Sequence, residues 1–405
     1  MHQFSVPSWF LDIGSTNFRS DAISSRSLAY GARLAEMSFA GFAEGMIDLS
    51  KRLLIAQLVA PDYRLAFFSH LSEQHFSLEV QAGDAYFEPT VRTSEAARNS
   101  PFVRTIATTF FFKRRFCWQH LSWRDVLTSS TFVCELNPRV LSSWLALIAR
   151  RLLGRRTVVW GHAWARKGPA ARTEFVRQRM RCLADGVLLY THQQRRELLE
   201  KYPHLHDRCF VAPNSLYRRS EMVAVERGGA RDFIYVGRLV GPKKVHVLID
   251  AFAIFSRHHP DSSLHIVGDG DCRQSLETRA KYSGANVSFH GHISDQTQLS
   301  ELYRQSIASV SPGYVGLSVT QSFSYGVPMI VSKDEPHSPE IEAITEGFNG
   351  SFFATDDPAS LAAEMERWYA GAEDLQTLSR DIVEQCRGAY SIEMMVTGFM
   401  QAVEG

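Results

Sequence analysis

Short apolar runs alternate with amphipathic segments along this chain, and the alternation predicts its architecture. The first convincing run, Arg52–Ala60, ends at Pro61 and has the continuous apolar character of a parallel strand buried on both faces. Further strands are expected at 76–81, 131–135, 156–160, 187–190, 233–236, 264–267, 286–290, 308–310 and 329–332, and helices at 65–74, 141–153 and 245–258. Strands that alternate with helices predict an α/β fold with parallel sheets covered on both faces.

The strand–helix pattern occurs in two blocks, which predicts two Rossmann-like, doubly wound domains. We place the first domain at residues 51–215 and the second at 230–388, with a charged, glycine-containing linker at Tyr217–Gly229 between them. Residues 1–50 show no clean strand and are treated as an N-terminal extension with no assigned function. Ligands of such sheets bind beyond the carboxyl ends of the strands, so the loops that follow strands are the expected binding sites.

The composition is that of an ordinary globular protein, but its charge is unevenly distributed. The 405 residues are 45% hydrophobic and 21% charged, and a net charge of +1 argues against nucleic-acid binding by the whole molecule. Between Leu136 and Ala184, however, eleven Arg and Lys residues accompany a single acid, Glu174. This block indicates an anionic partner, such as a phosphorylated substrate or an acidic membrane surface, unless its charges are merely solvated helix faces.

Cysteine usage and hydropathy indicate a cytoplasmic protein. The six cysteines are scattered without CxxC pairs or zinc-ligand spacing, as expected for reduced thiols. The N-terminus lacks a basic region followed by an apolar run, and no apolar stretch reaches the roughly 18 residues that span a bilayer. We therefore expect a cytoplasmic location, which is compatible with peripheral contact at the inner face of the plasma membrane.

A glycine, an arginine and a lysine follow one predicted strand of the second half. Gly237 ends the strand, Arg238 offers a planar fork of donors suited to phosphate oxygens, and Lys243 adds a point charge near the start of a helix. This combination predicts a diphosphate site, whereas the alternative is a pair of solvated surface cations.

The segment Tyr235–Phe252, which contains Y-V-G-R-L-V-G-P-K, closely resembles the donor-diphosphate motif of retaining glycosyltransferases of family 4 (glycosyl transferases group 1). These enzymes have the GT-B fold, in which two Rossmann-like domains face a cleft. The resemblance implies that Arg238 and Lys243 neutralise the leaving nucleoside diphosphate, that the second domain binds the nucleotide sugar and the first the acceptor, and that the last helix, about 391–403, returns to the first domain. Lys244 departs from the family pattern, which usually has glycine there.

The stretch Ser311–Pro328, SPGYVGLSVTQSFSYGVP, resembles the donor-sugar loop of the family but lacks its two glutamates. Gly313 and Gln321 stand at those positions. A small-residue loop at a helix start lets backbone N–H groups approach an anion, and Gln321 can still hydrogen-bond a ribose. Some branches of the family show the same glycine-rich form, PG-x-VGL. The resemblance implies that the donor site also includes Gly237, Gly268, Gly270, His292, Ile293, Tyr314, Val315, Gly316 and Leu317.

Glu340 is the expected replacement for the missing carboxylate. It lies in His337–Glu342, a proline–acid segment that the same branches carry after the next strand. We predict a catalytic role for Glu340. The alternative is that Glu340 merely caps a helix after Pro339.

The first half contributes one more catalytic candidate and several acceptor-binding candidates. His162 follows a strand end and resembles the histidine that faces the donor sugar across the family's cleft, although a structural histidine is the alternative. Arg64 lies in a P-x-Y-R segment that resembles the start of some polysaccharide-assembly transferases, and could bind an acceptor phosphate. The remaining acceptor-binding candidates also follow strands: Asn137, Arg139, Arg166 and Lys167.

Aromatic residues are interleaved with Arg and Lys between Phe110 and Arg124. Such a segment suits an interfacial helix lying on acidic lipid. Equally, the aromatics could face the core while the charges reach water.

Together these features favour a retaining glycosyltransferase that moves a hexose from a nucleoside-diphosphate sugar to a polysaccharide or lipid-diphosphate sugar acceptor. No metal or other cofactor is expected, because no DxD-like acidic pair follows a suitable strand and Arg238 and Lys243 can compensate the diphosphate charge. One alternative is a catalytically inactive GT-B module that binds a sugar nucleotide or a partner subunit. The other is a nicotinamide-dependent enzyme, although no G-x-G-x-x-G follows the first strand.

Overall fold

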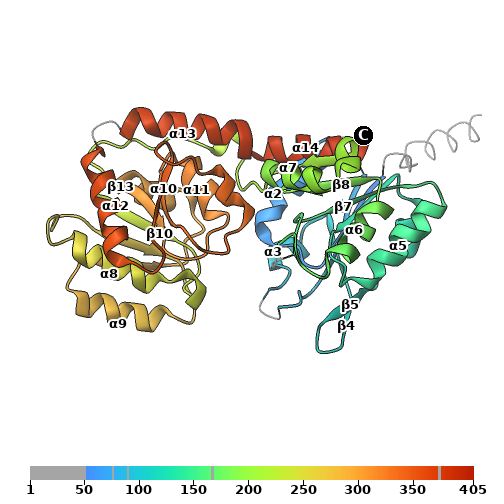
Figure 1. Ribbon diagram of the computed structural model, residues 1–405, viewed down its shortest axis with the longest axis horizontal. Helices are drawn as coiled ribbons and strands as arrows, with labels where there is room; N and C mark the ends of the chain where they lie inside the picture. The colour runs from blue at the N-terminus through green and yellow to red at the C-terminus, as the bar shows by residue number, and fades with distance from the viewer. Residues whose placement is uncertain (1–51, 75–76, 89–90, 166–167, 373–374) are drawn as a thin grey trace, which may run out of the picture. The chain divides into compact units, whose positions relative to one another are not determined.

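The computed structural model describes residues 52–405 except 75–76, 89–90, 166–167 and 373–374. The strands of this part form two parallel sheets and one antiparallel hairpin, and helices connect the parallel strands (Figure 1). The predicted α/β class is therefore confirmed. The extension expected at residues 1–50 lies outside the described residues.

The first sheet has seven strands in the order β3-β2-β1-β6-β7-β8-β9, and neighbouring strands run parallel. Their bounds are β1 (Arg52–Gln57), β2 (Ser77–Gly83), β3 (Val103–Ile106), β6 (Thr131–Glu135), β7 (Arg156–Trp160), β8 (Gly186–Leu189) and β9 (Cys209–Val211). The strand order reverses between β1 and β6. In doubly wound sheets this reversal is where ligands bind.

The second sheet repeats this winding with six strands in the order β12-β11-β10-β13-β14-β15, again parallel. Its strands are β10 (Asp232–Val236), β11 (Leu264–Val267), β12 (Val287–Gly291), β13 (Ser306–Ser311), β14 (Met329–Ser332) and β15 (Gly350–Phe353). The order reverses between β10 and β13. The loops after these two strands carry the predicted diphosphate and donor-sugar motifs.

The helices follow the amphipathic segments between strands. In the first half they are α2 (Leu65–Ser72), α3 (Glu95–Arg98), α4 (Trp123–Thr128), α5 (Leu141–Leu152), α6 (Glu174–Leu183) and α7 (His192–Lys201). The second half has α8 (Val245–Phe255), α9 (Arg273–Ser283), α10 (Gln296–Gln305), α11 (Ser318–Ser324), α12 (Pro358–Ala370), α13 (Leu375–Tyr390) and α14 (Ile392–Glu404). Thr191 caps α7, because its hydroxyl accepts a 3.1 Å hydrogen bond from the N–H of Gln194.

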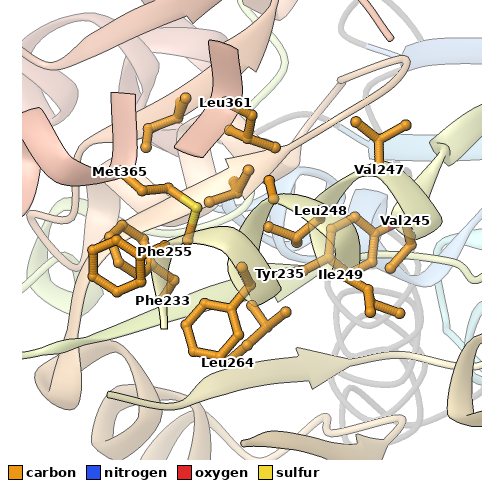
Figure 2. Close-up of a cluster of buried hydrophobic side chains, with 14 of the residues drawn as sticks. Phe233, Tyr235, Val245, Val247, Leu248, Ile249, Phe255, Leu264, Leu361 and Met365 are labelled. Atoms are coloured by element: carbon orange, nitrogen blue, oxygen red, sulfur yellow. The ribbon is translucent and has the colours of Figure 1, made fainter. Parts of the chain in front are cut away.

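Each sheet is buried on both faces, which explains the continuous apolar runs. In β10, Phe233 and Tyr235 join the core formed with α8 and α12, shown in Figure 2, whereas Ile234 lies in a separate cluster with α10. In β1, Leu53 and Ile55 likewise pack with α2 and α14, whereas alternate residues pack with α5, α6 and α7. The last helix, α14, thus lies against helix α2 and against strands β8 and β9 of the first sheet (Figure 1).

The aromatic and basic segment that begins at Phe110 does not form an interfacial helix, one of the two interpretations of its sequence. It forms a hairpin of β4 (Thr108–Phe111) and β5 (Phe116–Gln119), and α4 starts only at Trp123. Phe112, Lys113 and Arg114 form the turn with positive φ angles of 50°, 53° and 62°, a conformation that ends a strand and cannot continue a helix. Among the described helices, none is both long enough and apolar enough to cross a membrane.

The basic block between Leu136 and Ala184 is only partly a surface feature. Arg150 is fully buried, and its guanidinium donates to several backbone carbonyls, including Ser129 O at 3.1 Å and Arg156 O at 2.6 Å. Arg181 is also fully buried and pairs with Glu174 at 2.7 Å. These two cations stabilise the fold, so only the remaining exposed ones are available to an anionic partner.

Candidate active site

The glycines predicted to bind the donor hold two strand-end loops in close contact. The N–H of Gly237, after β10, donates to Val267 O at 2.9 Å, and the N–H of Gly268, after β11, donates to Gly291 O at 2.7 Å. Gly268 has φ +135°, and a Cβ there would lie 1.8 Å from Gly237 O. Gly270, with φ +156°, would likewise place a Cβ 2.4 Å from Leu239 O. Glycine is required at both positions because two backbones meet there.

These packed loops present Arg238 at the carboxyl edge of the second sheet. Its side chain is exposed, and its guanidinium has no hydrogen bond or ion pair with the residues that the structure describes. The backbone of Arg238, in contrast to its side chain, is held in place, because the hydroxyl of buried Tyr235 donates to Arg238 O at 2.9 Å. Arg238 is therefore a positioned cation available to a ligand.

Lys243 is close enough to Arg238 for the two charges to interact. It ends a single 3-10 turn, Gly241–Lys243, and its Nζ donates to Tyr314 O at 2.6 Å while lying 4.8 Å from the centre of the Tyr314 ring. Burial and, secondly, the charge of Arg238 lower the pKa of Lys243 to about 8. Two cations held together without a described acid beside them favour binding of a polyanion.

Lys244, the departure from the family pattern, has a structural role. It adopts a left-handed conformation with φ 50°, which explains the usual glycine there. Its Nζ pairs with Glu335 at 2.6 Å and with Asp356 at 2.7 Å. Lys244 is thus paired with acids, unlike Arg238 and Lys243.

Gly313 accepts no larger residue in this arrangement. A Cβ there would lie 2.3 Å from Pro242 O and 2.8 Å from the carbonyl carbon of Lys243. The N–H of Tyr314 also donates to Pro242 O at 3.1 Å, which holds the two loops together. The glutamate that the family usually carries at this position would therefore displace the lysine loop.

His337 fixes the loop after Gly313 in place, although the sequence analysis assigned it no role. Its Nδ1 accepts from the N–H of Val315 at 3.2 Å, and its Nε2 donates to Ser332 O at 2.8 Å. Burial lowers the pKa of His337, which favours the neutral ring that this pattern needs. Ser338 adds a bond from its N–H to Val315 O at 2.9 Å and a contact between its hydroxyl and that of Tyr314.

The other donor-site candidates lie in different settings. Gln321, in α11, donates from Nε2 to the hydroxyl of Tyr217 at 3.1 Å, a partner that the sequence analysis did not identify. His292 is exposed, whereas Ile293 packs against the cluster that contains Val267 and Leu299. Val315 is buried, Leu317 immediately precedes α11, and Gly316 lies beside Ser338.

Glu340 is connected to the first sheet through a buried chain of hydrogen bonds. It lies in the 3-10 turn Pro339–Ala343, and its Oε1 accepts from Asn214 Nδ2 at 2.8 Å. Asn214 Oδ1 in turn accepts from Arg64 Nη2 at 3.1 Å. Arg64 and Glu340 are each 5% exposed, and Arg64 Nη1 and Glu340 Oε2 have no partner in the described chain. Buried polar atoms of this kind are costly unless a ligand or water binds them.

The same chain of contacts reaches His162. Arg64 Nη2 also donates to the Tyr190 hydroxyl at 3.3 Å, and the His162 ring centre lies 4.9 Å from that of Tyr190. The guanidinium carbon of Arg64 also lies 4.3 Å from the centre of the Trp160 ring, which adds a cation–π contact. Desolvation of the ring by the surrounding protein, together with the charges of Arg177 and Arg64, lowers the pKa of His162 to about 4, although part of the residue remains exposed to solvent. His162 is therefore neutral at physiological pH and can share a proton with a hydroxyl.

The remaining acceptor-site candidates divide into three groups. Asn137 begins the turn after β6, where its Oδ1 accepts from the N–H of Arg139 at 3.2 Å. Arg139 donates from Nε to Arg115 O at 2.7 Å and lies 3.6 Å from the Phe87 ring centre, so it anchors the hairpin. Arg166 and Lys167 lie outside the described residues.

Glu135 is a further candidate residue of the active site, which the sequence analysis did not identify. It ends β6, and its Oε1 accepts from the N–H of Leu58 at 2.7 Å. Burial raises the pKa of Glu135 to about 7, although the Leu58 hydrogen bond and Arg64 oppose the shift. The signal available in the sequence was a carboxyl group at the end of the strand predicted at 131–135. The structure adds that this strand borders the reversal of strand order.

Comparison with known proteins finds a family match in the second half of the chain. Residues 219–384 match the family model described as glycosyl transferases group 1. Glycogen synthase of Mycobacterium tuberculosis is 32% identical over 142 residues, which cover 34% of this chain and 33% of that protein. D-rhamnosyltransferase WbpZ of Pseudomonas aeruginosa is 30% identical over 149 residues, covering 35% and 37% respectively. The chain thus spans about a third of the length of these curated relatives.

The likeness to solved structures extends over both sheets. HepE of Anabaena, solved in complex with UDP, superposes with a TM-score of 0.65 at 14% identity, covering 87% of this chain and 99% of that chain. At this identity the match shows the fold alone, and that fold is GT-B. The fold expected from the sequence is therefore confirmed.

Proposed function

We propose that this chain is a retaining hexosyltransferase, because residues 219–384 match the glycosyl transferases group 1 model and the fold is GT-B. The donor is a nucleoside-diphosphate sugar, and the acceptor is a hydroxyl group of a polysaccharide or a lipid-diphosphate sugar. The reaction takes place in the cytoplasm, at the inner face of the membrane that carries such an acceptor. The paired cations Arg238 and Lys243 are the observation that carries this proposal.

The diphosphate binds where those two cations meet. Arg238 provides two parallel N–H donors for phosphate oxygens, and Lys243 provides a second positive charge held by Tyr314 O at 2.6 Å. When the bond between the anomeric carbon and the phosphate oxygen breaks, negative charge grows on that oxygen. Cations fixed before the reaction stabilise this charge without reorganisation. No metal ion is needed for charge compensation in this proposal.

Glu340 and His162 act on the sugars. The free Oε2 of Glu340 accepts from a donor-sugar hydroxyl, which replaces the carboxylate that Gly313 cannot supply. Neutral His162 hydrogen-bonds a sugar hydroxyl and orients the acceptor. The acceptor hydroxyl oxygen forms the new bond to the anomeric carbon, and its proton passes to the departing phosphate oxygen. No protein nucleophile takes part.

Turnover of donor sugars by the purified chain tests the proposal. UDP-, GDP- and ADP-sugars are first compared by thermal shift, because a bound ligand stabilises the native state by mass action. Release of nucleoside diphosphate and sugar transfer to glycan acceptors are then measured for the best donor. The double variant Arg238→Ala, Lys243→Ala should lose both donor binding and transfer.

A non-catalytic GT-B module that binds a sugar nucleotide or a partner subunit is the second candidate. It is favoured by Gly313, which has no room for a glutamate, and by Gln321, which is engaged with Tyr217 at 3.1 Å. Nucleotide binding without turnover on a broad acceptor panel would support this candidate over the enzyme.

A further inference from the structure

A shallow hollow lies over helices α8 and α9, which cover one face of the second sheet. The two helices lie side by side (Figure 1), and their apolar residues Leu248 and Leu276 face the core. The volume of the hollow is about 490 Å³, and six residues line it: Asp250, Ser275, Thr278, Arg279, Tyr282 and Ser283. None of these six residues belongs to the candidate active site, so the proposed transfer reaction does not explain the hollow.

Tyr282 provides an aromatic ring that water can reach. The residue is 85% exposed, the largest exposed fraction among the large hydrophobic residues that the structure describes. A ring of this kind presents a flat apolar face on which a ligand can stack. A single exposed apolar side chain is ordinary by itself, so the polar groups around Tyr282 decide what the ligand is.

An ion pair between the two helices lies in the same hollow. Arg279 Nε and Nη2 donate to the two carboxylate oxygens of Asp250, each at 2.6 Å. This fork leaves Arg279 Nη1 without a hydrogen bond to the described part of the chain. The side chains of Arg279 and Asp250 are 47% and 32% exposed, so a ligand can reach both. The pair therefore offers N–H donors and carboxylate lone pairs in fixed positions.

Two hydroxyl groups of α9 add hydrogen-bond acceptors to the lining. Ser275 Oγ donates to Cys272 O at 2.7 Å, and Thr278 Oγ1 donates to Gln274 O at 2.9 Å. Because each hydroxyl proton is directed to the helix backbone, the lone pairs of its oxygen remain for a donor on the ligand. The hollow thus offers both donors and acceptors beside an aromatic ring.

A smaller cavity of about 190 Å³ adjoins the hollow, since Ser275 and Arg279 line both spaces. The smaller cavity extends to Gly241, which begins the turn that ends at Lys243. The two spaces together form one elongated depression, the α8–α9 groove. An elongated depression suits a chain of several units better than a single small molecule.

We propose that the α8–α9 groove binds an uncharged oligosaccharide. A sugar ring has an apolar C–H face, which stacks on Tyr282, and hydroxyl groups that both donate and accept hydrogen bonds. The charges of Asp250 and Arg279 cancel, and Lys244 in the smaller cavity is paired with acids, so the lining does not favour a nucleotide or phosphate. An apolar ligand is disfavoured because it would bury these polar groups without partners.

The binding does not depend on the transfer reaction, because the lining of the hollow and the candidate active site share no residue. Retention of a polysaccharide acceptor near the enzyme between turnovers would be its consequence, and only that consequence rests on the proposed function.

Saturation-transfer NMR and titration calorimetry with the full chain test the proposal. The probes are maltohexaose, cellohexaose and mannohexaose as uncharged oligosaccharides, and UDP as a nucleotide. At least one oligosaccharide should bind. Tyr282→Ala should weaken this binding by at least about fivefold, because it removes the stacking face, whereas Tyr282→Trp should retain it. The fold should tolerate both substitutions, since Tyr282 is exposed.

Phe175→Ala is the matched control, since Phe175 is an aromatic residue of α6 that is 69% exposed. This variant should bind the oligosaccharide like the unsubstituted chain. Absence of binding by all three oligosaccharides, equal binding by the unsubstituted chain and Tyr282→Ala, or equal weakening in Phe175→Ala would each overturn the proposal. UDP binding that Tyr282→Ala weakens would assign the groove to a nucleotide instead and overturn it as well.

Transfer to a small soluble acceptor, measured on the same samples, reports separately on the proposed enzyme activity. Tyr282→Ala should leave this transfer unchanged. A chain that binds the oligosaccharide through Tyr282 but transfers no sugar would contradict the proposed function and leave the groove assigned.

Discussion

Lys243 and Tyr314 are joined directly, because Lys243 Nζ donates a 2.6 Å hydrogen bond to the carbonyl oxygen of Tyr314. This bond connects the loop after β10 to the loop after β13, on the two sides of the point where the strand order reverses. The predicted diphosphate motif and the predicted donor-sugar motif therefore form one site. Its geometry depends on the close approach of Gly313 to Pro242.

Nucleotide affinity should weaken as pH rises above about 8. Burial and Arg238 lower the pKa of Lys243 to about 8, so the unbound protein loses this charge at higher pH, whereas a bound diphosphate favours the charged form. The dissociation constant should then rise by up to about tenfold per pH unit over the interval between the free and bound pKa values of Lys243. Titration calorimetry with UDP or GDP at several pH values measures this slope. Lys243→Arg should flatten it, and an equally steep slope in that variant would contradict the assignment.

Gly313→Ala should destabilise the protein and weaken nucleotide binding together. The new Cβ would meet Pro242 O at 2.3 Å, which forces the Lys243 loop to move. Overpacking of this kind costs about 1–3 kcal/mol of unfolding free energy, measurable by urea denaturation. Gly228→Ala is the control, because a Cβ there would have no heavy atom within 4 Å and Gly228 lies outside the candidate site. Equal effects of the two substitutions would show that the close approach is not what requires Gly313.

Glu340→Gln should abolish sugar transfer while nucleotide binding is retained. In the unsubstituted chain, Asn214 Nδ2 donates to Glu340 Oε1 at 2.8 Å. A glutamine Oε1 can still accept this hydrogen bond, so the fold is preserved while the charge is lost. Glu342→Gln is the control on the same turn, because Glu342 accepts from the N–H of Gln193 at 2.8 Å and is not part of the hydrogen-bonded chain that joins Asn214 to Glu340. Turnover unchanged by Glu340→Gln would exclude Glu340 from the reaction.

Arg150→Met should destabilise the fold without any effect on the candidate site. The buried guanidinium of Arg150 donates hydrogen bonds to the carbonyl oxygens of Ser129, Ser130 and Arg156. Its loss leaves these buried acceptors unsatisfied. We expect a loss of about 2–4 kcal/mol in urea denaturation. Arg155→Met removes an exposed cation from the same segment and should change stability by less than about 0.5 kcal/mol. Similar losses in the two variants would refute the structural role of Arg150.

Ten of the parallel strands were predictable because the centres of both sheets are buried on both faces, whereas β3, β9 and β15 were not predicted. The predicted strands at Leu264–Val267 and Met329–Ser332 coincide with β11 and β14, because three of the four residues in each are apolar and all four are buried. The β4–β5 hairpin was not predicted, and an interfacial helix was one of the two interpretations of its sequence. Its exposed aromatics and its turn of three non-glycine residues with positive φ carry no recognisable strand or turn signal.

The local part of the site was predictable, and the long-range part was not. Arg238 and Lys243 are five residues apart and follow a strand, so sequence spacing was enough to place them together. Asn214 bonds Glu340 across 126 positions, and His337 bonds Val315 across 22. Such partners depend on how segments distant in the sequence pack in the folded chain, which a single sequence does not reveal.

Donor turnover by the chain and by its Arg238→Ala, Lys243→Ala variant tests the central claim most directly. The account predicts that the unsubstituted chain releases nucleoside diphosphate from a sugar nucleotide and transfers the sugar to an acceptor with retained anomeric configuration. It predicts that the double variant keeps its fold and loses both activities, because Arg238 is exposed and neither residue belongs to a hydrophobic core cluster. Equal turnover by the two proteins would contradict the account.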